Sequence, residues 1–293
     1  MDNYLWNNRI EYLIRSRKAM WNDDYIQFLV ERVWKLHMPV NMIDFGCGMG
    51  FMGAMLLPFL PKGSVYTGID KGKKLLDEAR KVFSDSSYSV SFIEADLLEY
   101  QPDNKYDLAI SHTVLQHIPN CINILEKMRD SVLSGGLVIC MEVDRNLANA
   151  GLYFHGVDYN QLNNLGILQK LWLNDLQNEG SDHCVGVKIP AYMQEIGLND
   201  IGVRVNDCVN FINAKGNVEK YKTEYDCFTS GGWGSMESDK DKVVTSLITR
   251  GLTKEEAEYQ YNCEMLCNTY VNDNKETACI VNALCQIISF GMV

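Results

Sequence analysis

The chain has 293 residues and a formal net charge of −11, and hydrophobic residues make up 46% of it. This length and composition predict a globular protein with one large domain, or with a core domain and an added subdomain. Nucleic-acid binders usually carry a basic face, so the acidic balance argues against them, and we expect no nucleic-acid partner.

The sequence carries no strong signal for a membrane span, for disulfide bonds or for a metal site. No apolar run approaches the roughly 20 residues that span a bilayer, so we expect no membrane association. The opening residues lack the basic segment of a signal peptide, and the ten cysteines contain no Cys-x-x-Cys pair. Free thiols and a cytoplasmic location are therefore expected. The closest cysteines, Cys263 and Cys267, predict helix packing, and we expect no metal site.

The first 38 residues are rich in aromatic side chains, and we expect residues 1–38 to form a helical lid or cap. From Trp21 to Trp34 the sequence favours a helix packed on the core. For the earlier aromatic residues, a lid over a ligand cleft and packing on the core remain equal alternatives. These earlier residues are Tyr4, Trp6 and Tyr12.

Between residues 39 and 144, short apolar runs alternate with helical segments. This alternation predicts βαβ units and a parallel sheet covered by helices on both faces, with ligands beyond the carboxyl ends of the strands. The predicted strands are 40–45, 64–70, 89–96, 105–112 and 135–143, and the predicted helices are 49–60, 71–83 and 120–133.

The regular alternation ends after Asp144. We expect a cap insertion with a helix over 159–178, then one helix and one strand of the core, then a helical insertion, and finally one apolar strand. Within the helical insertion, Thr253 and Glu256 have capping-box spacing, and Gly251 would end the preceding helix. The corresponding ranges are 145–188, 189–213, 214–276 and 277–293.

Four glycines follow the first strand closely, in VNMIDFGCGMGFMG at 40–53. Gly48, Gly50 and Gly53 match a dinucleotide-binding fingerprint, and Asp70 lies 20 residues after Gly50, as an NAD ribose-binding acid would. An NAD-dependent dehydrogenase is therefore one alternative. However, the glycine that leaves the strand directly is Gly46. Counted from it, the third glycine position holds Phe51, which would crowd the helix against the strand.

Carboxylates at the strand ends favour a different ligand. Asp44 would repel phosphates but suits the ammonium and sulfonium groups of S-adenosylmethionine, which has no phosphate. Asp70 can accept hydrogen bonds from both ribose hydroxyls. The stem of Lys71 can lie along the adenine, and Asp96 can accept from the adenine amino group. The backbone of Ser111-His112 would lie near the methionyl ammonium.

The segment Ile43-Asp44-Phe45-Gly46-Cys47-Gly48-Met49-Gly50 resembles the first motif of the class I S-adenosylmethionine-dependent methyltransferases. Segments at 68–70, 94–100, 106–118 and 133–143 resemble its later motifs, in order. The resemblance implies an α/β fold with a doubly wound, mostly parallel seven-stranded sheet, its last strand antiparallel, with helical cap insertions. The cofactor-binding residues would be Asp44, Gly46, Cys47, Gly48, Gly50, Asp70, Lys71, Asp96, Leu97, Ser111 and His112.

The resemblance further implies methyl transfer to a small-molecule acceptor by in-line displacement. The acceptor and the oligomeric state stay open, because the chain departs from the family pattern at 145–188 and 216–276. A non-catalytic S-adenosylmethionine-binding sensor or partner subunit is an alternative, and a metalloid methyltransferase is a remote one. No catalytic residue is identified, and His117 is expected to pack in the turn before Pro119. Substrate contacts are predicted for Glu142, Tyr153 and His155.

Overall fold

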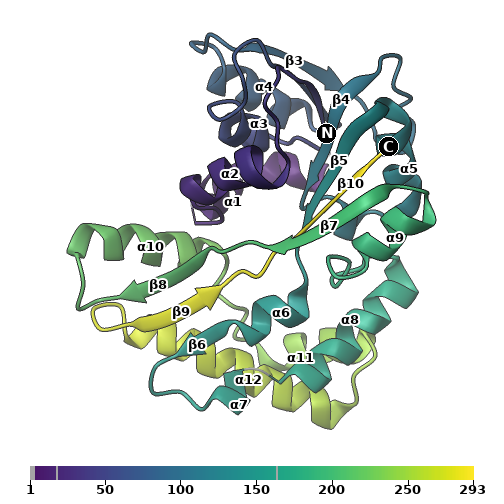
Figure 1. The fold of residues 1–293 in the computed structure, drawn as a ribbon. Coiled ribbons are helices and arrows are strands. Elements are labelled where there is room, and N and C mark those ends of the chain that lie inside the picture. The colour runs from purple at the N-terminus through teal and green to yellow at the C-terminus, as the bar shows by residue number, and fades with distance from the viewer. Residues whose placement is uncertain (1–3, 18, 163) are drawn as a thin grey trace.

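The protein is built around a seven-stranded sheet, seen in the upper half of the computed structural model, which describes residues 4–17, 19–162 and 164–293 (Figure 1). Its strand order is β3-β2-β1-β4-β5-β10-β7. β10 pairs antiparallel with both of its neighbours, and the other strands are parallel to one another. The predicted sheet and its antiparallel last strand are confirmed. The strands are β1 (Asn41–Phe45), β2 (Val65–Asp70), β3 (Ser89–Glu94), β4 (Tyr106–His112), β5 (Val132–Glu142), β7 (Asn199–Val205) and β10 (Ile287–Met292).

Helices cover both faces of this sheet because alternate side chains of its central strands point to opposite sides. On β1, Met42 enters one buried cluster, whereas Ile43 and Phe45 enter another. The first cluster includes residues of α2 (Asp23–Phe28), the π-helical turn η2 (Leu29–Val33), α3 (Phe51–Leu56) and α4 (Lys73–Val82). The second includes residues of α5 (Ile122–Ser131) and α9 (Ile189–Glu195).

The N-terminal segment begins with a 3₁₀ turn, η1 (Leu5–Asn8), and helix α1 (Ile10–Arg17). The segment from Trp21 to Trp34 packs on the core as predicted, since both tryptophans and Ile26 are buried in the first cluster. Helix α3 is shorter than the predicted 49–60. It begins only after Gly50, whose left-handed backbone (φ +74°) is incompatible with a helical residue.

A second, three-stranded sheet of order β6-β9-β8 lies below the main sheet in Figure 1, and the sequence did not predict it. Its strands are β6 (Leu152–Phe154), β8 (Val209–Asn213) and β9 (Cys279–Ala283). The single strands predicted within 189–213 and within 277–293 are each divided between the two sheets. The two crossing segments are tied together, because the Asn206 backbone amide donates to the Gln286 carbonyl oxygen at 2.8 Å.

Helices surround the smaller sheet and complete the lower part of the molecule. A cluster that includes the buried Phe154 and Phe228 and the partly buried Tyr270 packs between the smaller sheet and these helices. The single helix predicted over 159–178 is two helices. None of the helices in the described part of the chain is long and apolar enough to cross a membrane. The helices are α6 (Arg145–Ala150), α7 (Tyr159–Leu162), α8 (Leu165–Glu179), α10 (Val218–Ser230), α11 (Lys240–Thr249) and α12 (Lys254–Asp273).

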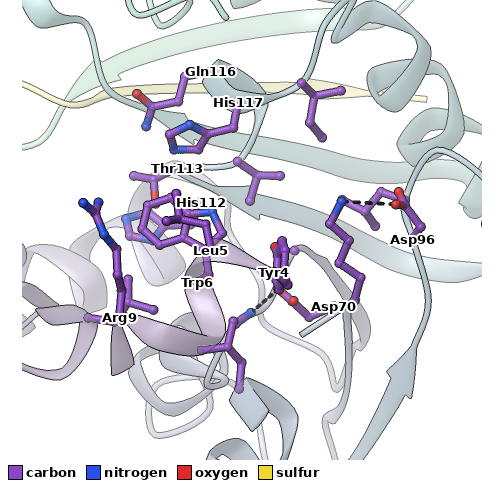
Figure 2. A pocket seen from close by; sticks show the side chains of 18 of the residues that line it. Tyr4, Leu5, Trp6, Arg9, Asp70, Asp96, His112, Thr113, Gln116 and His117 are labelled. Atoms are coloured by element: carbon purple, nitrogen blue, oxygen red, sulfur yellow. Dashed lines mark hydrogen bonds and ion pairs between the residues drawn. The ribbon is translucent and has the colours of Figure 1, made fainter. Parts of the chain in front are cut away.

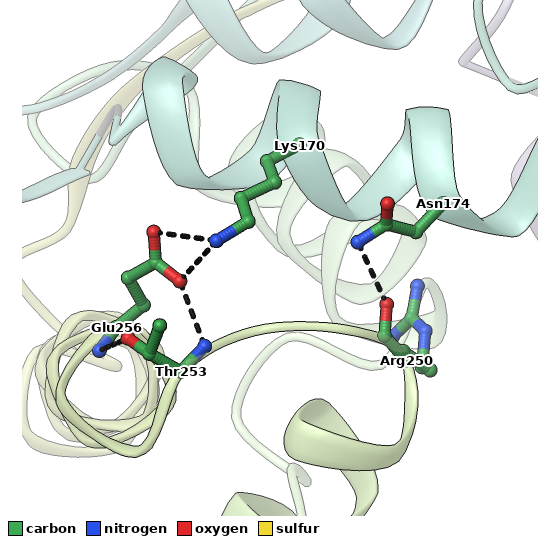
Figure 3. A network of polar contacts seen from close by, with 5 residues as sticks. All are labelled: Lys170, Asn174, Arg250, Thr253 and Glu256. Atoms are coloured by element: carbon green, nitrogen blue, oxygen red, sulfur yellow. Dashed lines mark hydrogen bonds and ion pairs between the residues drawn. The ribbon is translucent and has the colours of Figure 1, made fainter.

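The predicted capping box at the start of α12 is present, and an ion pair links its glutamate to α8 (Figure 3). The Thr253 hydroxyl accepts from the Glu256 amide at 3.2 Å, and a Glu256 carboxylate oxygen accepts from the Thr253 amide at 2.8 Å. Lys170 of α8 donates to both oxygens of the same carboxylate, at 2.9 and 2.6 Å. Gly251 follows α11 with a left-handed backbone, as predicted.

Gly53 of α3 lies where the helix comes closest to β2. A Cβ atom at this position would lie 2.6–2.9 Å from the fully buried ring of Tyr66. We expect Gly53→Ala to lower the free energy of unfolding by about 1–3 kcal/mol, because the ring cannot move aside in a packed core. Urea denaturation measures this change.

Gly166 of α8 provides the matched control, since a Cβ atom there meets nothing within 4 Å. Gly166→Ala should raise the free energy of unfolding by about 0.5–1 kcal/mol through helix propensity. A Gly53→Ala protein as stable as the parent would contradict the packing described for α3.

Candidate functional site

The turn after β1 is the first component of the site. Gly46 has a left-handed backbone (φ +77°), and a Cβ atom on it would lie 2.6 Å from a methyl carbon of Val114. The amides of Gly46 and Cys47 both donate to the Ile69 carbonyl oxygen at 2.8 Å. The turn is therefore anchored to the carboxyl end of β2, with its bare backbone facing the ends of the strands.

Asp70, the last residue of β2, is held by the backbone on both sides. One carboxylate oxygen accepts from the Gly48 amide at 2.9 Å, and the other accepts from the Gly72 amide at 2.7 Å. Burial raises its pKa, and these backbone hydrogen bonds act in the opposite direction. A carboxylate has about four lone-pair sites, so each oxygen retains capacity to accept a further hydrogen bond.

A cavity of about 610 Å³ lies over these strand ends (Figure 2). Its volume is in the range of small-molecule sites, about 300–1,000 Å³. Gly46, Gly48 and Asp70 line it from the sheet side, and residues of the N-terminal segment line it from the other side. The N-terminal lining residues are Tyr4, Leu5, Trp6, Arg9, Tyr12, Leu13 and Met20.

Lys71 and Asp96 lie at one end of the cavity, where β2 and β3 finish. The Lys71 ammonium lies 3.2 Å from an Asp96 oxygen and 5.0 Å from the centre of the Tyr4 ring. Hydrogen bonding from the Leu98 amide is the main cause that holds the pKa of Asp96 below its usual value. Leu97 lines the cavity beside this pair, and the Lys127 ammonium fixes its carbonyl oxygen at 2.8 Å.

Asp44 lies beneath the glycine turn and lines a small adjoining cavity of about 40 Å³, together with Cys47 and His112. One of its oxygens accepts from the Tyr66 hydroxyl at 2.7 Å. The other oxygen is buried without a hydrogen-bond partner among the residues that the structure describes. Burial raises the pKa of Asp44 to about 7; the Tyr66 hydrogen bond opposes this shift, and the charge of Asp70 adds to it.

His112, the last residue of β4, lines both cavities. The Trp21 indole N–H lies 3.3 Å from His112 Nε2, and the indole can only donate. The Nε2 atom therefore accepts, which places the ring proton of the neutral imidazole on Nδ1. His117 also lines the large cavity and packs edge-on against Trp6, with ring centres 5.2 Å apart.

Glu142 is fully buried at the end of β5 and does not line the cavity. One of its oxygens accepts from the amides of Val114 and Leu115, at 3.0 and 2.9 Å. The lining of the cavity does not include the substrate contact predicted for Glu142, whose carboxylate instead holds the loop that packs on Gly46. Gly50 and Ser111 were predicted to contact S-adenosylmethionine, but neither residue lines the large or the small cavity.

Tyr153 and His155, the other predicted substrate contacts, lie on and just after β6 in the smaller sheet, where the Tyr153 hydroxyl is 3.4 Å from His155 Nδ1. Neither residue is among those that line the large cavity. The structure does not bring them to the site because β6 belongs to the smaller sheet, where it pairs with β9.

Several lining residues were not predicted as site residues. The aromatic density of the N-terminal segment gave a signal for Tyr4, Trp6 and Tyr12. No sequence pattern singled out the other polar residues of the lining, which are Arg9, Thr113, Gln116 and Arg145. In the described ranges, no group of three or more His, Cys, Asp or Glu residues could hold a metal ion.

Comparisons with known proteins agree with this arrangement. A family profile described as "Methyltransferase domain" matches residues 36–181. A trans-aconitate 2-methyltransferase from Rhizobium etli is 31% identical over 105 residues, which cover 36% of this chain and 39% of that protein. A ubiquinone biosynthesis O-methyltransferase from Vibrio vulnificus is 26% identical over 109 residues, with 36% and 45% coverage. This chain thus spans less than half the length of these relatives.

A solved structure of Haemonchus contortus phosphoethanolamine N-methyltransferase 2, in complex with S-adenosyl-L-methionine, has a similar fold, with a TM-score of 0.51. It is 13% identical, and the match covers 99% of this chain and 60% of that one, so the likeness concerns the fold alone. The strand order, the sequence motifs and the matched family domain agree. The chain belongs to the class I S-adenosylmethionine-dependent methyltransferase family.

Proposed function

We propose that this protein transfers the methyl group of S-adenosylmethionine to a small-molecule acceptor. One observation carries the proposal: the glycine turn brings a backbone-held carboxylate, Asp70, which lines the large cavity, close to a second buried carboxylate, Asp44, which lines the small adjoining cavity. Two carboxylates beside one turn would repel a pyrophosphate, but they suit a cationic ligand that carries ribose hydroxyls.

The side chains present fit the methyl donor. The unpartnered oxygen of Asp44 can accept from the donor's ammonium group, which would satisfy an otherwise costly buried acceptor. The remaining lone pairs of Asp70 can accept from the two ribose hydroxyls. Lys71, Asp96 and Leu97 lie together at one end of the cavity, where they can enclose the adenine.

The bound sulfonium supplies an activated methyl group and leaves as a neutral thioether. The protein's contribution is to orient the two substrates and exclude water, and orientation alone can provide about 7–11 kcal/mol. We propose that the N-terminal segment acts as the lid that excludes water, because Tyr4, Leu5 and Trp6 cover the strand ends. His112 Nε2 already accepts from Trp21, so we assign it a positioning role rather than that of a base.

Other properties of the protein follow as proposals. The relatives named above act on small molecules by their names, which supports a small-molecule acceptor here. The net charge of −11 supports the absence of a nucleic-acid partner, and ten cysteines without a Cys-x-x-Cys pair support a cytoplasmic location.

Transfer of label tests the proposed function. The purified protein is incubated with S-adenosylmethionine labelled in the methyl group and with a small-molecule metabolite extract. We expect label to appear in a new product and S-adenosylhomocysteine to accumulate. Tight S-adenosylhomocysteine binding without any label transfer would instead indicate a non-catalytic sensor or partner subunit.

A further inference from the structure

Two arginines, Arg9 of the N-terminal segment and Arg145 at the start of α6, line the cavity and take no part in the donor contacts proposed above. Tyr12 connects them. The Arg9 guanidinium lies 5.8 Å from the Tyr12 ring centre, and Tyr12 also interacts electrostatically with Arg145. The two cations therefore belong to the same part of the cavity.

Arg9 is held by aromatic rings rather than by an acid. Its guanidinium lies 5.9 Å from the ring centre of Trp6, in addition to its contact with Tyr12. Rings orient a guanidinium through its face and leave its five N–H donors at the edge available. Among the described residues, no carboxylate forms an ion pair with Arg9.

Arg145 also lacks an ion pair with any described residue, although Asp175 is near enough to influence its pKa. Asp175 is neutralised by another partner, because both its oxygens accept from the Arg250 guanidinium, at 3.1 and 2.6 Å. Arg145 is therefore left without a carboxylate partner among the described ion pairs. Its charge is felt by His183, whose pKa is lowered first by burial and then by the charge of Arg145.

The cavity is thus polarised along its length. At one end the carboxylates of Asp70 and Asp96 face the site, and Lys71 is paired with Asp96. Figure 2 shows Arg9 on the opposite side of the cavity from Asp96. The proposed donor contacts occupy the acidic end, so the end lined by Arg9 and Arg145 remains for a ligand group that carries an oxyanion.

We propose that Arg9 and Arg145 bind an oxyanion of the methyl acceptor, a carboxylate or a phosphate. This inference rests on the proposed methyl transfer and names its substrate class. Guanidinium groups recognise both anions through two parallel hydrogen bonds, which would fix the orientation of the acceptor as well as its affinity. The N-terminal position of Arg9 would also couple acceptor binding to closure of the lid.

The donor itself carries one carboxylate, and an arginine that bound only this group would give the same cationic lining. The two assignments predict different variant behaviour. If the arginines serve the acceptor, Arg9→Gln and Arg145→Gln should leave the affinity for S-adenosylhomocysteine within twofold of the parent. They should raise the KM for the acceptor at least tenfold.

The experiment begins with anion-exchange fractionation of the metabolite extract at pH 7. Each fraction is assayed with the labelled donor, using the parent, Arg9→Gln, Arg145→Gln and, as a matched control, Arg32→Gln, an exposed arginine of η2. We expect mass spectrometry of the labelled product to show a carboxylate or a phosphate, and we expect the activity to be lost after phosphatase treatment only if the anion is a phosphate. Both cavity variants should show the tenfold rise in KM, and Arg32→Gln should not.

Distinct outcomes separate the two proposals. No labelled product from the unfractionated extract would count against methyl transfer itself. Label transfer to an acceptor that carries neither a carboxylate nor a phosphate, as shown by mass spectrometry of the labelled product, would overturn the oxyanion assignment and leave methyl transfer intact. A tenfold loss of S-adenosylhomocysteine affinity in both variants, with unchanged affinity for 5′-methylthioadenosine, which lacks the amino-acid group, would assign the arginines to the donor carboxylate.

Discussion

Replacing Asp70 with alanine is expected to weaken the binding of S-adenosylhomocysteine by at least about 100-fold. The ribose hydroxyls would lose their hydrogen bonds to the carboxylate, and hydrogen bonds to a charged group contribute about 1.5–3 kcal/mol each. The substitution would also remove the acceptor for the amides of Gly48 and Gly72, so the glycine turn would lose its hydrogen bond to the end of β2. Isothermal titration calorimetry measures the affinity, and circular dichroism checks that the variant is folded.

Two further variants control this measurement. Asp77→Asn changes an exposed acid of α4 that pairs with Arg80 and should leave the affinity unchanged. Asp96→Asn changes a half-exposed acid already paired with Lys71, so its loss of affinity should be less than tenfold. A folded Asp70→Ala protein that binds S-adenosylhomocysteine as tightly as the parent would contradict the proposed hydrogen bonds between Asp70 and the ribose.

Replacing Asp44 with asparagine is expected to weaken donor binding and to stabilise the ligand-free protein at the same time. The pKa of Asp44 is raised from 3.8 in the unfolded reference to about 7 in the fold. A raised carboxyl pKa costs stability progressively as the pH rises from about 4 to about 7, and the cost then stays constant. Asparagine cannot ionise, so the variant should gain stability over the parent across this pH range.

The measurement compares urea denaturation of the two ligand-free proteins at pH 5 and pH 8. The difference in the free energy of unfolding should favour Asp44→Asn by about 2 kcal/mol more at pH 8 than at pH 5. At pH 8 the variant should bind S-adenosylhomocysteine about tenfold less tightly, because the ammonium loses its charged partner. An Asp44→Asn protein that is less stable than the parent at pH 8 would contradict the claim that the buried, ionised Asp44 carboxylate destabilises the ligand-free fold.

The sequence predicted the central strands of the main sheet because β1, β4 and β5 contain short apolar runs that end at polar residues. It could not separate β7 from β8, or β9 from β10, because only three residues lie between the members of each pair. The division depends on tertiary pairing: Asn206 and Gln286 meet where the two segments cross between the sheets. No local pattern encodes that meeting.

The predicted donor site rests on residues whose chemistry and local motif coincide. Asp44, Gly48 and Asp70 lie within or just after short motifs, and the structure places them around one turn. Glu142 shows the limit of this reasoning, because a carboxylate at a strand end has the same sequence signature whether it meets a substrate or a neighbouring loop. Arg9 and Arg145 could not be predicted, since isolated arginines carry no pattern until the fold brings them together.

Calorimetric titration of the purified protein with S-adenosylhomocysteine and, separately, with NADH tests the nature of the cofactor most directly. Carboxylates of Asp44 and Asp70 beside the glycine turn predict saturable binding of S-adenosylhomocysteine at one site per chain and no heat from NADH. Saturable binding of NADH, together with no binding of S-adenosylhomocysteine by the folded protein, would contradict the account.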